Sequence, residues 1–262
     1  MGSQWDNFLR NLGEWRGSFC SLNADGLVID TTPSILTLEQ AQEERLVRFR
    51  LRRYGAGGYG SAPSSDYSQD YRSLGRQVVF FETGSFSKGT LQLAPASVFG
   101  AEFGFVAGDR RHRLVQLHSP EGAFERLVLI REFRAGTEAS ERPPLEWGNL
   151  LGPWSGQAAT ITADWPEPQL CGCVLQIERG DGDQIQIRTQ LGEREEVDGG
   201  GARLMLLPDG GYSLTPTQVS HRQALVVEAG WLPAPQRLER LIRRYDASGA
   251  WLSSTQIIAT AL

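Results

Sequence analysis

The sequence is poor in the side chains that most often carry out covalent or metal chemistry. Lys88 is its single lysine, so catalysis through a Schiff base, which requires a lysine, is nearly excluded. Its three cysteines, Cys20, Cys171 and Cys173, are an odd number without a disulfide framework, and with only three histidines they offer no metal-ligand spacing. We therefore predict no metal site and a reducing, cytoplasmic location.

Membrane, secretion and catalytic signals are also missing. No apolar run reaches the roughly 18 residues that a membrane-spanning helix requires, and the N-terminus lacks the apolar core of a signal peptide. The net charge of -5 argues against nucleic acid as a partner. The chain has no Gly-x-Ser-x-Gly elbow, no Walker sequence and no paired histidines, so we assign no catalytic residues. An enzymatic role is left open, and a non-enzymatic one is favoured.

What the sequence does contain is a repeated motif. Leu-Gly-x-Trp-x-Gly occurs at 12–17 and again at 151–156. Apolar residues before each copy are spaced i, i+3, i+4, which is typical of one face of a short helix. Gly13 and Gly152 permit the sharp change of backbone direction that must follow such a helix. The repeat indicates that the chain is built from two similar units.

Short strand-like runs follow each copy, separated by turns rich in Gly, Asp, Ser and Pro. Residues 137–144 have the composition of a linker, which predicts a first domain over 1–136 and a second over 145–262. About eight antiparallel strands would leave two exposed edges unless the sheet closes into a barrel. The predicted fold is therefore all-β, with two tandem antiparallel β-barrels, each preceded by a short helical turn.

The motif at the start of each unit resembles the signature of the lipocalin, or calycin, superfamily. Gly13-x-Trp15 and Gly152-x-Trp154 carry this resemblance, which implies that each unit is a lipocalin-like barrel with a buried tryptophan at its base. In that superfamily an arginine of the last strand packs over the signature tryptophan, where it gains a cation–π contact. The resemblance assigns this role to Arg131 and Arg243, with Arg244 as a competing choice.

A narrower resemblance covers most of the chain. The stretches 80–89, 102–105, 129–132 and 241–245 resemble an uncharacterised two-barrel calycin family of cyanobacteria and photosynthetic eukaryotes. That family has no established activity, so the resemblance implies a fold and a habitat rather than a reaction. The single-barrel phycobilin lyases are a more distant resemblance, which rests on the calycin signature alone.

Aromatic residues on two predicted strands are the best candidates for a ligand pocket. Phe99, Phe103 and Phe105 share one strand face, and Phe49 with Leu51 shares another. Ligand pockets are mostly apolar with a few placed polar groups, so these five residues are predicted to line one cavity. The alternative is that they form an ordinary filled core.

Charged residues on the same two strands are expected to face solvent. Glu102 alternates with the phenylalanines and is predicted to be an outward ion-pair partner. Arg48, Arg50 and Arg52 alternate with Phe49 in the same way, which favours a solvated outer face over an anion-steering surface.

The leading hypothesis is non-enzymatic binding of a small hydrophobic or tetrapyrrole-like molecule, such as a bilin, in photosynthetic pigment metabolism. A second hypothesis is a phycobilin lyase or chromophore chaperone, whose partner would be a phycobiliprotein. A third is a protein-interaction module with filled barrels. The sequence alone leaves the ligand, the hollowness of either barrel and the oligomeric state open.

Overall fold

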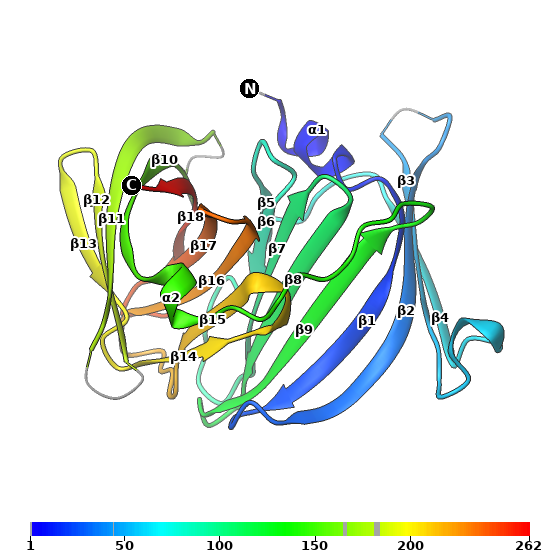
Figure 1. The fold of residues 1–262 in the computed structure, drawn as a ribbon, viewed down its shortest axis with the longest axis horizontal. Helices are drawn as coiled ribbons and strands as arrows, with labels where there is room; N and C mark the ends of the chain where they lie inside the picture. Colours follow the sequence, from blue (N-terminus) through cyan, green and yellow to red (C-terminus); the bar gives the residue numbers. More distant parts are fainter. Residues whose placement is uncertain (1, 44, 165–166, 181–183) are drawn as a thin grey trace.

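The computed structural model describes residues 2–43, 45–164, 167–180 and 184–262. Its first half contains α1 (Gln4–Leu9), β1 (Gly13–Asn23), β2 (Val28–Gln40), β3 (Val47–Arg53), η1 (Gly58–Gly60), β4 (Ser65–Tyr71), β5 (Val78–Phe80), β6 (Phe86–Gly89), β7 (Phe99–Ala107), β8 (Arg110–His118) and β9 (Phe124–Arg134). These strands form one antiparallel sheet in the order β4-β3-β2-β1-β9-β8-β7-β6-β5 (Figure 1).

The second half repeats this arrangement. It contains α2 (Trp147–Leu150), β10 (Gly152–Thr162), β11 (Gln169–Arg179), β12 (Ile185–Leu191), β13 (Arg194–Asp198), β14 (Ala202–Leu206), η2 (Pro208–Gly210), β15 (Gly211–Pro216), β16 (Leu225–Ala234), β17 (Arg237–Tyr245) and β18 (Trp251–Ala261). The strand order is β13-β12-β11-β10-β18-β17-β16-β15-β14, so the two sheets have the same topology.

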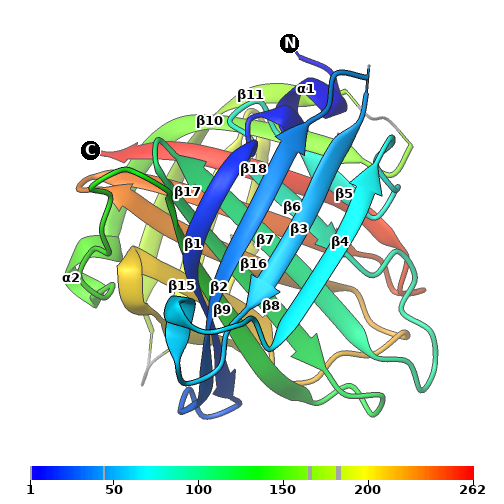
Figure 2. The ribbon, with the colours of Figure 1, turned by 90° about the vertical axis from the view of Figure 1, so that its right-hand side faces the viewer.

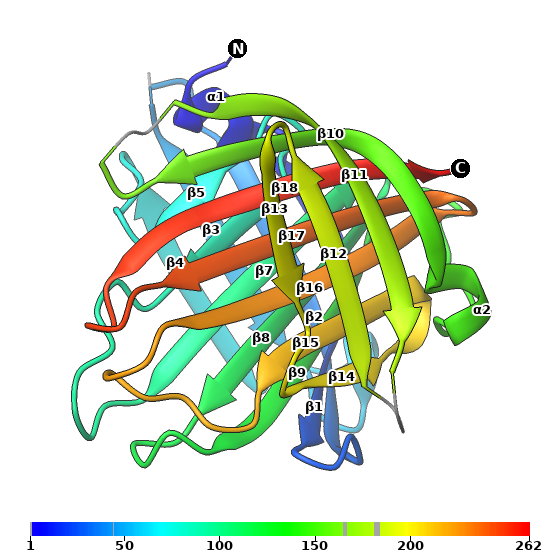
Figure 3. The ribbon, with the colours of Figure 1, turned by 90° about the vertical axis from the view of Figure 1, so that its left-hand side faces the viewer.

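The prediction of an all-β chain with two tandem antiparallel units, each with a short helix, is confirmed. Each sheet curls into a half-barrel. Strands β1–β4 form one outer wall of the molecule (Figure 2), and β10–β13 form the opposite one (Figure 3). The predicted closure into a full barrel is not complete in the first unit. Its edge strands are β4 and β5, and no pairing joins them in the described part of the chain.

The repeated motif has the same geometry in both units. Gly13 and Gly152 have φ angles of 122° and 117°, a region that favours glycine. The indole Nε1 of Trp15 donates a hydrogen bond to the backbone carbonyl of Asn11 at 2.9 Å, and that of Trp154 donates to Leu150 at 3.0 Å. A buried indole N–H needs such an acceptor. The helical segment therefore supplies the carbonyl acceptor, and the glycine allows the backbone to turn so that the indole N–H of the tryptophan can reach this carbonyl.

The two half-barrels share a hydrophobic core. One cluster of buried side chains contains residues of both sheets, including Leu114 and Leu127 from the first and Val227, Ala229 and Leu241 from the second. One face of β7 and one face of β8 pack against β15 and β16 of the second sheet. The tandem units therefore form one packed body.

Candidate functional site

The concave face of the first sheet encloses a cavity of about 400 Å³. Apolar side chains from the helix and the first six strands form its walls, and Phe49 and Leu51 of β3 are half-buried among them. The other apolar side chains that line the cavity are Phe8, Phe19, Leu36, Leu38, Tyr71, Leu74, Val78, Phe80 and Phe86, together with Val115 of β8 and Ile130 of β9. This cavity is concave, largely apolar and partly open, as small-molecule sites generally are.

Charged side chains lie on the opposite wall, on β7, β8 and β9. The guanidinium of Arg113 donates two hydrogen bonds to Glu132, both at 3.0 Å, and one from Nη1 to Oε1 of Glu102 at 2.9 Å. Burial alone would raise the pKa of Glu132, but Arg111 and Arg113 outweigh it and lower this pKa. Glu132 is therefore ionised, and Arg113 uses all its nitrogens on protein carboxylates.

Arg111 is the second cation of this wall, and it is less well satisfied. Its side chain is 4% exposed, and its Nε lies 2.9 Å from Oε2 of Glu132 without the geometry of a hydrogen bond. Neither Nε nor Nη1 has a hydrogen-bond partner among the described residues. Burial lowers the pKa of Arg111 to about 10, against the opposing effect of Glu132. Arg111 is therefore still charged at neutral pH.

The five residues predicted to line one pocket do not lie together. Phe99, Phe103 and Phe105 are fully buried in the core between the sheets, where the Phe105 ring lies 6.1 Å from that of Trp231. Glu102, which was predicted to face outward, lines the cavity instead. The two faces of β7 are thus the reverse of the prediction: the phenylalanine face is buried against the second sheet, and the face with Glu102 points into the cavity. A binding role for Phe49 and Leu51 stays a prediction.

Two arginines lie over the first signature tryptophan, Arg134 and, at 5.4 Å from the ring centre, Arg111, and the assignment to Arg131 is wrong. The guanidinium carbon of Arg134 lies 4.3 Å from the centre of the Trp15 ring, and its Nη1 donates to the carbonyl of Leu12. Arg131 forms an ion pair with Glu141 in the linker. Trp15 pairs with Arg134 in the sheet register, so the residue directly opposite the indole supplies the nearer of the two cations.

The second assignment, Arg243 over Trp154, is also wrong. Arg243 is fully buried and lies 4.7 Å from the centre of the Trp251 ring, and its Nε donates to the hydroxyl of Tyr245. The sheet register places Ala261 opposite Trp154. The second unit therefore has an alanine where the first has its cation.

The second concave face has a different polar interior. Arg240 of β17 donates to both carboxylate oxygens of Glu228 and to the hydroxyl of Thr189, and Tyr212 also donates to Glu228. Burial, followed by the charge of Glu228, raises the pKa of Tyr212 well above its ordinary value. These buried polar groups satisfy one another's hydrogen bonds.

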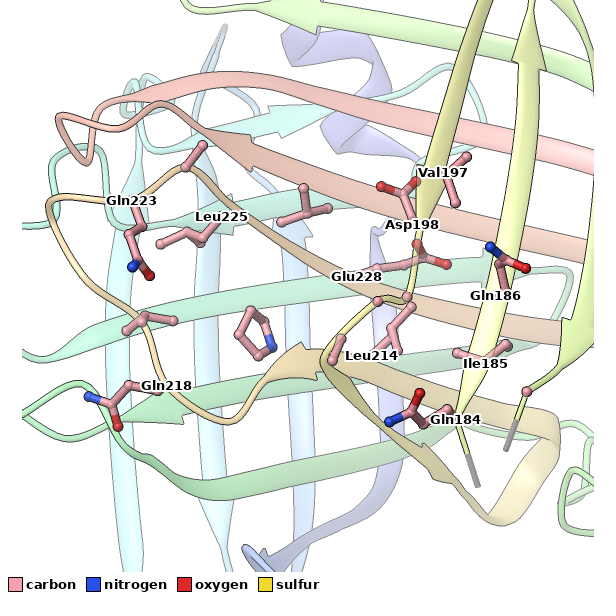
Figure 4. Close-up of a pocket in the computed structure, with 18 of the residues that line it drawn as sticks. Gln184, Ile185, Gln186, Val197, Asp198, Leu214, Gln218, Gln223, Leu225 and Glu228 are labelled. Carbon is pink, nitrogen blue, oxygen red and sulfur yellow. The ribbon is translucent and has the colours of Figure 1, made fainter. Parts of the chain in front are cut away.

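A cavity of about 570 Å³ lies at one end of the second half-barrel (Figure 4). Asp198 of β13 and Glu228 of β16 are the charged residues in its described lining, and the side-chain amides of Gln184 and Gln186 add to its polar character. This cavity is therefore polar, and its two carboxylates are ion-paired with Arg240 and Arg244, whereas the first cavity is apolar with an excess of cations.

The charged wall of the first cavity was not predicted from the sequence, although the sequence contains a signal for it. Glu102-x-Gly104 and Glu228-x-Gly230 are corresponding sequences of β7 and β16. A Cβ at Gly104 would lie 2.1 Å from the Phe86 ring, and one at Gly230 would lie 1.9 Å from the ring of Tyr212. Each glycine therefore admits an aromatic ring beside a glutamate that faces the interior of its half-barrel, and the repeat indicates such a glutamate in both units.

Two further findings concern metals and membranes. Across the described residues, no group of three or more His, Cys, Asp or Glu side chains is arranged to hold a metal ion. None of the described helices is long and apolar enough to cross a membrane.

Known proteins resemble this chain at the level of family and fold. Residues 1–137 match the model described as domain of unknown function (DUF3598), N-terminal, and residues 141–200 and 196–261 match the C-terminal domain of biogenesis factor required for ATP synthase 1. No curated protein matches the chain.

Two solved structures extend these matches. A DUF3598 protein of unknown function from Nostoc punctiforme is 39% identical, with 100% of both chains covered and a TM-score of 0.89. An S-type phycobiliprotein lyase from Guillardia theta is 9% identical over 100% of this chain and 93% of the other, with a TM-score of only 0.21. The family predicted from the sequence is confirmed: the chain belongs to the DUF3598 family.

Proposed function

We propose that the first half-barrel binds a small, largely apolar molecule without catalysing a reaction on it. The observation that supports this proposal is the cavity of about 400 Å³, with apolar walls and the half-buried side chains of Phe49 and Leu51. Small-molecule pockets commonly measure roughly 300–1,000 Å³, so the volume is suitable. A linear tetrapyrrole such as a bilin is the ligand class that we favour, with a role in pigment metabolism.

Binding of a bilin is also compatible with a phycobilin lyase or chromophore chaperone, which would deliver the pigment to a phycobiliprotein. The cavity would then hold the bilin while the acceptor protein provides the thiol. We place this alternative second, because no nucleophile or acid–base pair has been assigned in the cavity. The free thiols of Cys20, Cys171 and Cys173 support the predicted cytoplasmic location.

A titration with biliverdin and with the neutral dye Nile red tests the proposal. Both probes should bind saturably, and Leu51→Trp should weaken binding at least about tenfold, because the larger side chain occupies the cavity. Arg48→Trp is the matched control, since Arg48 is exposed on the opposite face of the same strand. Saturable binding of neither probe, or equal effects of the two substitutions, would contradict the proposal.

A second candidate function is a protein-interaction module that assists the assembly of ATP synthase. The match of the C-terminal half to a domain of an ATP synthase biogenesis factor supports it, and so does the well-satisfied interior of the second half-barrel. Deletion of the gene should then reduce the amount of assembled ATP synthase on native gels, and the Leu51→Trp protein should restore it. An unchanged amount of assembled complex would count against this candidate.

A further inference from the structure

We propose that the ligand of the first cavity carries a carboxylate, and that Arg111 binds this group. The inference rests on the proposed function, because it assigns the polar end of a ligand in the same cavity. It depends on the state of the two cavity-lining arginines of β8, the charge of the cavity and the contrast with the second half-barrel.

The two arginines of β8 that line the cavity, Arg111 and Arg113, differ in how their donors are used. Arg113 donates from Nε, Nη1 and Nη2 to Glu132 and Glu102. Arg111 lines the same cavity, yet its Nε and Nη1 donate to no atom among the described residues. A buried donor without an acceptor is costly, and the cost is larger for a charged group. A carboxylate placed against Arg111 would remove this cost.

The charge of the cavity also favours an anion. Three cations line it, namely Lys88, Arg111 and Arg113, whereas the carboxylates on this wall are Glu102 and Glu132. Lys88 is half-exposed and lies 3.8 Å from Glu102, whereas Arg111 and Arg113 share the single carboxylate of Glu132. One positive charge is left over on this wall, and one carboxylate of a ligand would neutralise it.

The second half-barrel provides an internal comparison. Its β17 carries Leu238 at the register position of Arg111, and β18 carries Ala259 at that of Glu132. The carboxylates that line its own cavity, Asp198 and Glu228, already pair with Arg244 and Arg240, and the described lining of that cavity contains no cation for a further carboxylate. An arginine at this position, with two donor nitrogens that make no hydrogen bond to the described residues, is thus found in the first unit and not in the second, and the ligand is expected in the first unit.

The orientation of the ligand follows from the two walls. Apolar side chains of β2 and β3 face the charged strands β7, β8 and β9 across the cavity. A ligand with a carboxylate at one end would place it against Arg111 and its apolar body against Leu36, Phe49 and Leu51. Fatty acids and pigments with a propionate side chain both have this chemistry.

The test compares dansyl-undecanoic acid with its methyl ester by the increase in dansyl fluorescence on binding to the full chain. The native protein should bind the acid about tenfold or more tightly than the ester, which is the usual effect of a hydrogen-bonded charge. Arg111→Leu, which introduces the residue of the second unit, should abolish this preference and leave ester binding within about twofold. Arg111→Lys should keep part of the preference.

Arg48→Leu is the control for loss of a positive charge, and it should leave the affinity for the acid unchanged because Arg48 is exposed on the outer face. Circular dichroism checks that each variant is folded. If Arg111→Leu does not fold, the role of Arg111 is tested by the ratio of acid to ester affinity in the native protein and in Arg111→Lys.

The outcomes separate the two proposals. Equal binding of acid and ester by the native protein, or an unchanged preference in Arg111→Leu, would overturn the role of Arg111 and leave the apolar site in place. Failure of both probes and of Nile red to bind would overturn the site itself.

Discussion

Phe105→Ala should destabilise both half-barrels together, although the residue belongs to the first. Phe105 is fully buried in the shared core, where its ring lies 6.1 Å from that of Trp231 in the second sheet. Truncation of a buried phenylalanine to alanine typically costs about 3–5 kcal/mol, because it removes transferred apolar area and leaves a cavity. The shared core should transmit this cost to both sheets.

The expected change in melting temperature follows from the length of the chain. An unfolding entropy of about 2.1 cal/mol/K per residue gives about 0.55 kcal/mol/K for 262 residues. A loss of about 3–5 kcal/mol should therefore lower the Tm by about 5–9 °C. Differential scanning calorimetry of the native protein should show one transition, and the variant should show one transition at the lower temperature.

The matched control is Phe49→Ala, because Phe49 is half-buried and faces the first cavity rather than the second sheet. Its Tm should fall by less than half as much. Two separate transitions in Phe105→Ala, with only the first displaced, would refute the reasoning, since it would mean that the two sheets unfold independently.

Three further predictions concern single side chains. Arg134→Ala should lower the free energy of unfolding by about 0.5–2 kcal/mol in urea titrations, because it removes a cation–π contact, whereas Arg131→Ala should change it by less than about 0.5 kcal/mol. Gly104→Ala should cost more than about 1 kcal/mol, since the new Cβ would meet the Phe86 ring, whereas Gly172→Ala, with open space around it, should be tolerated; equal costs would contradict the close packing. Burial lowers the pKa of His112 below its ordinary value of 6.5 in spite of Asp209, so the unfolded chain binds the proton more tightly. Stability should therefore fall as the pH drops below 6.5, and His112→Gln should weaken this dependence in urea titrations at several pH values; the same slope in both proteins would exclude His112 as its cause.

Much of the architecture could be predicted from local signals. The repeated helix–Gly–Trp motif indicates two units because a backbone turn with φ near 120° requires glycine at Gly13 and Gly152. The alternation along β3 identified the correct faces, since the arginines of one face contrast strongly with Phe49 and Leu51 on the other. Such signals depend on neighbours within a strand, which the sequence displays directly.

The candidate site was predicted less well. Alternation along β7 divides its residues into two faces, but Glu102 on one face and Phe103 on the other do not reveal which face meets a second sheet. An apolar face is buried wherever a partner covers it, and here the partner is 120 or so residues away in the chain, at Val227 and Trp231. The face of β7 that carries Glu102, which points into the cavity, could therefore be taken for a solvent-exposed face.

By itself, the sequence determined the two antiparallel units, the buried signature tryptophans and the family, because these depend on short-range motifs and alternation. Only the tertiary structure decided that the phenylalanines of β7 join the two sheets and that Arg134 covers Trp15. It also brought Arg111, Arg113 and Glu132 together on one wall of the first cavity. Sheet register and the docking of one sheet on another set these placements, and both are long-range packing outcomes that no local pattern encodes.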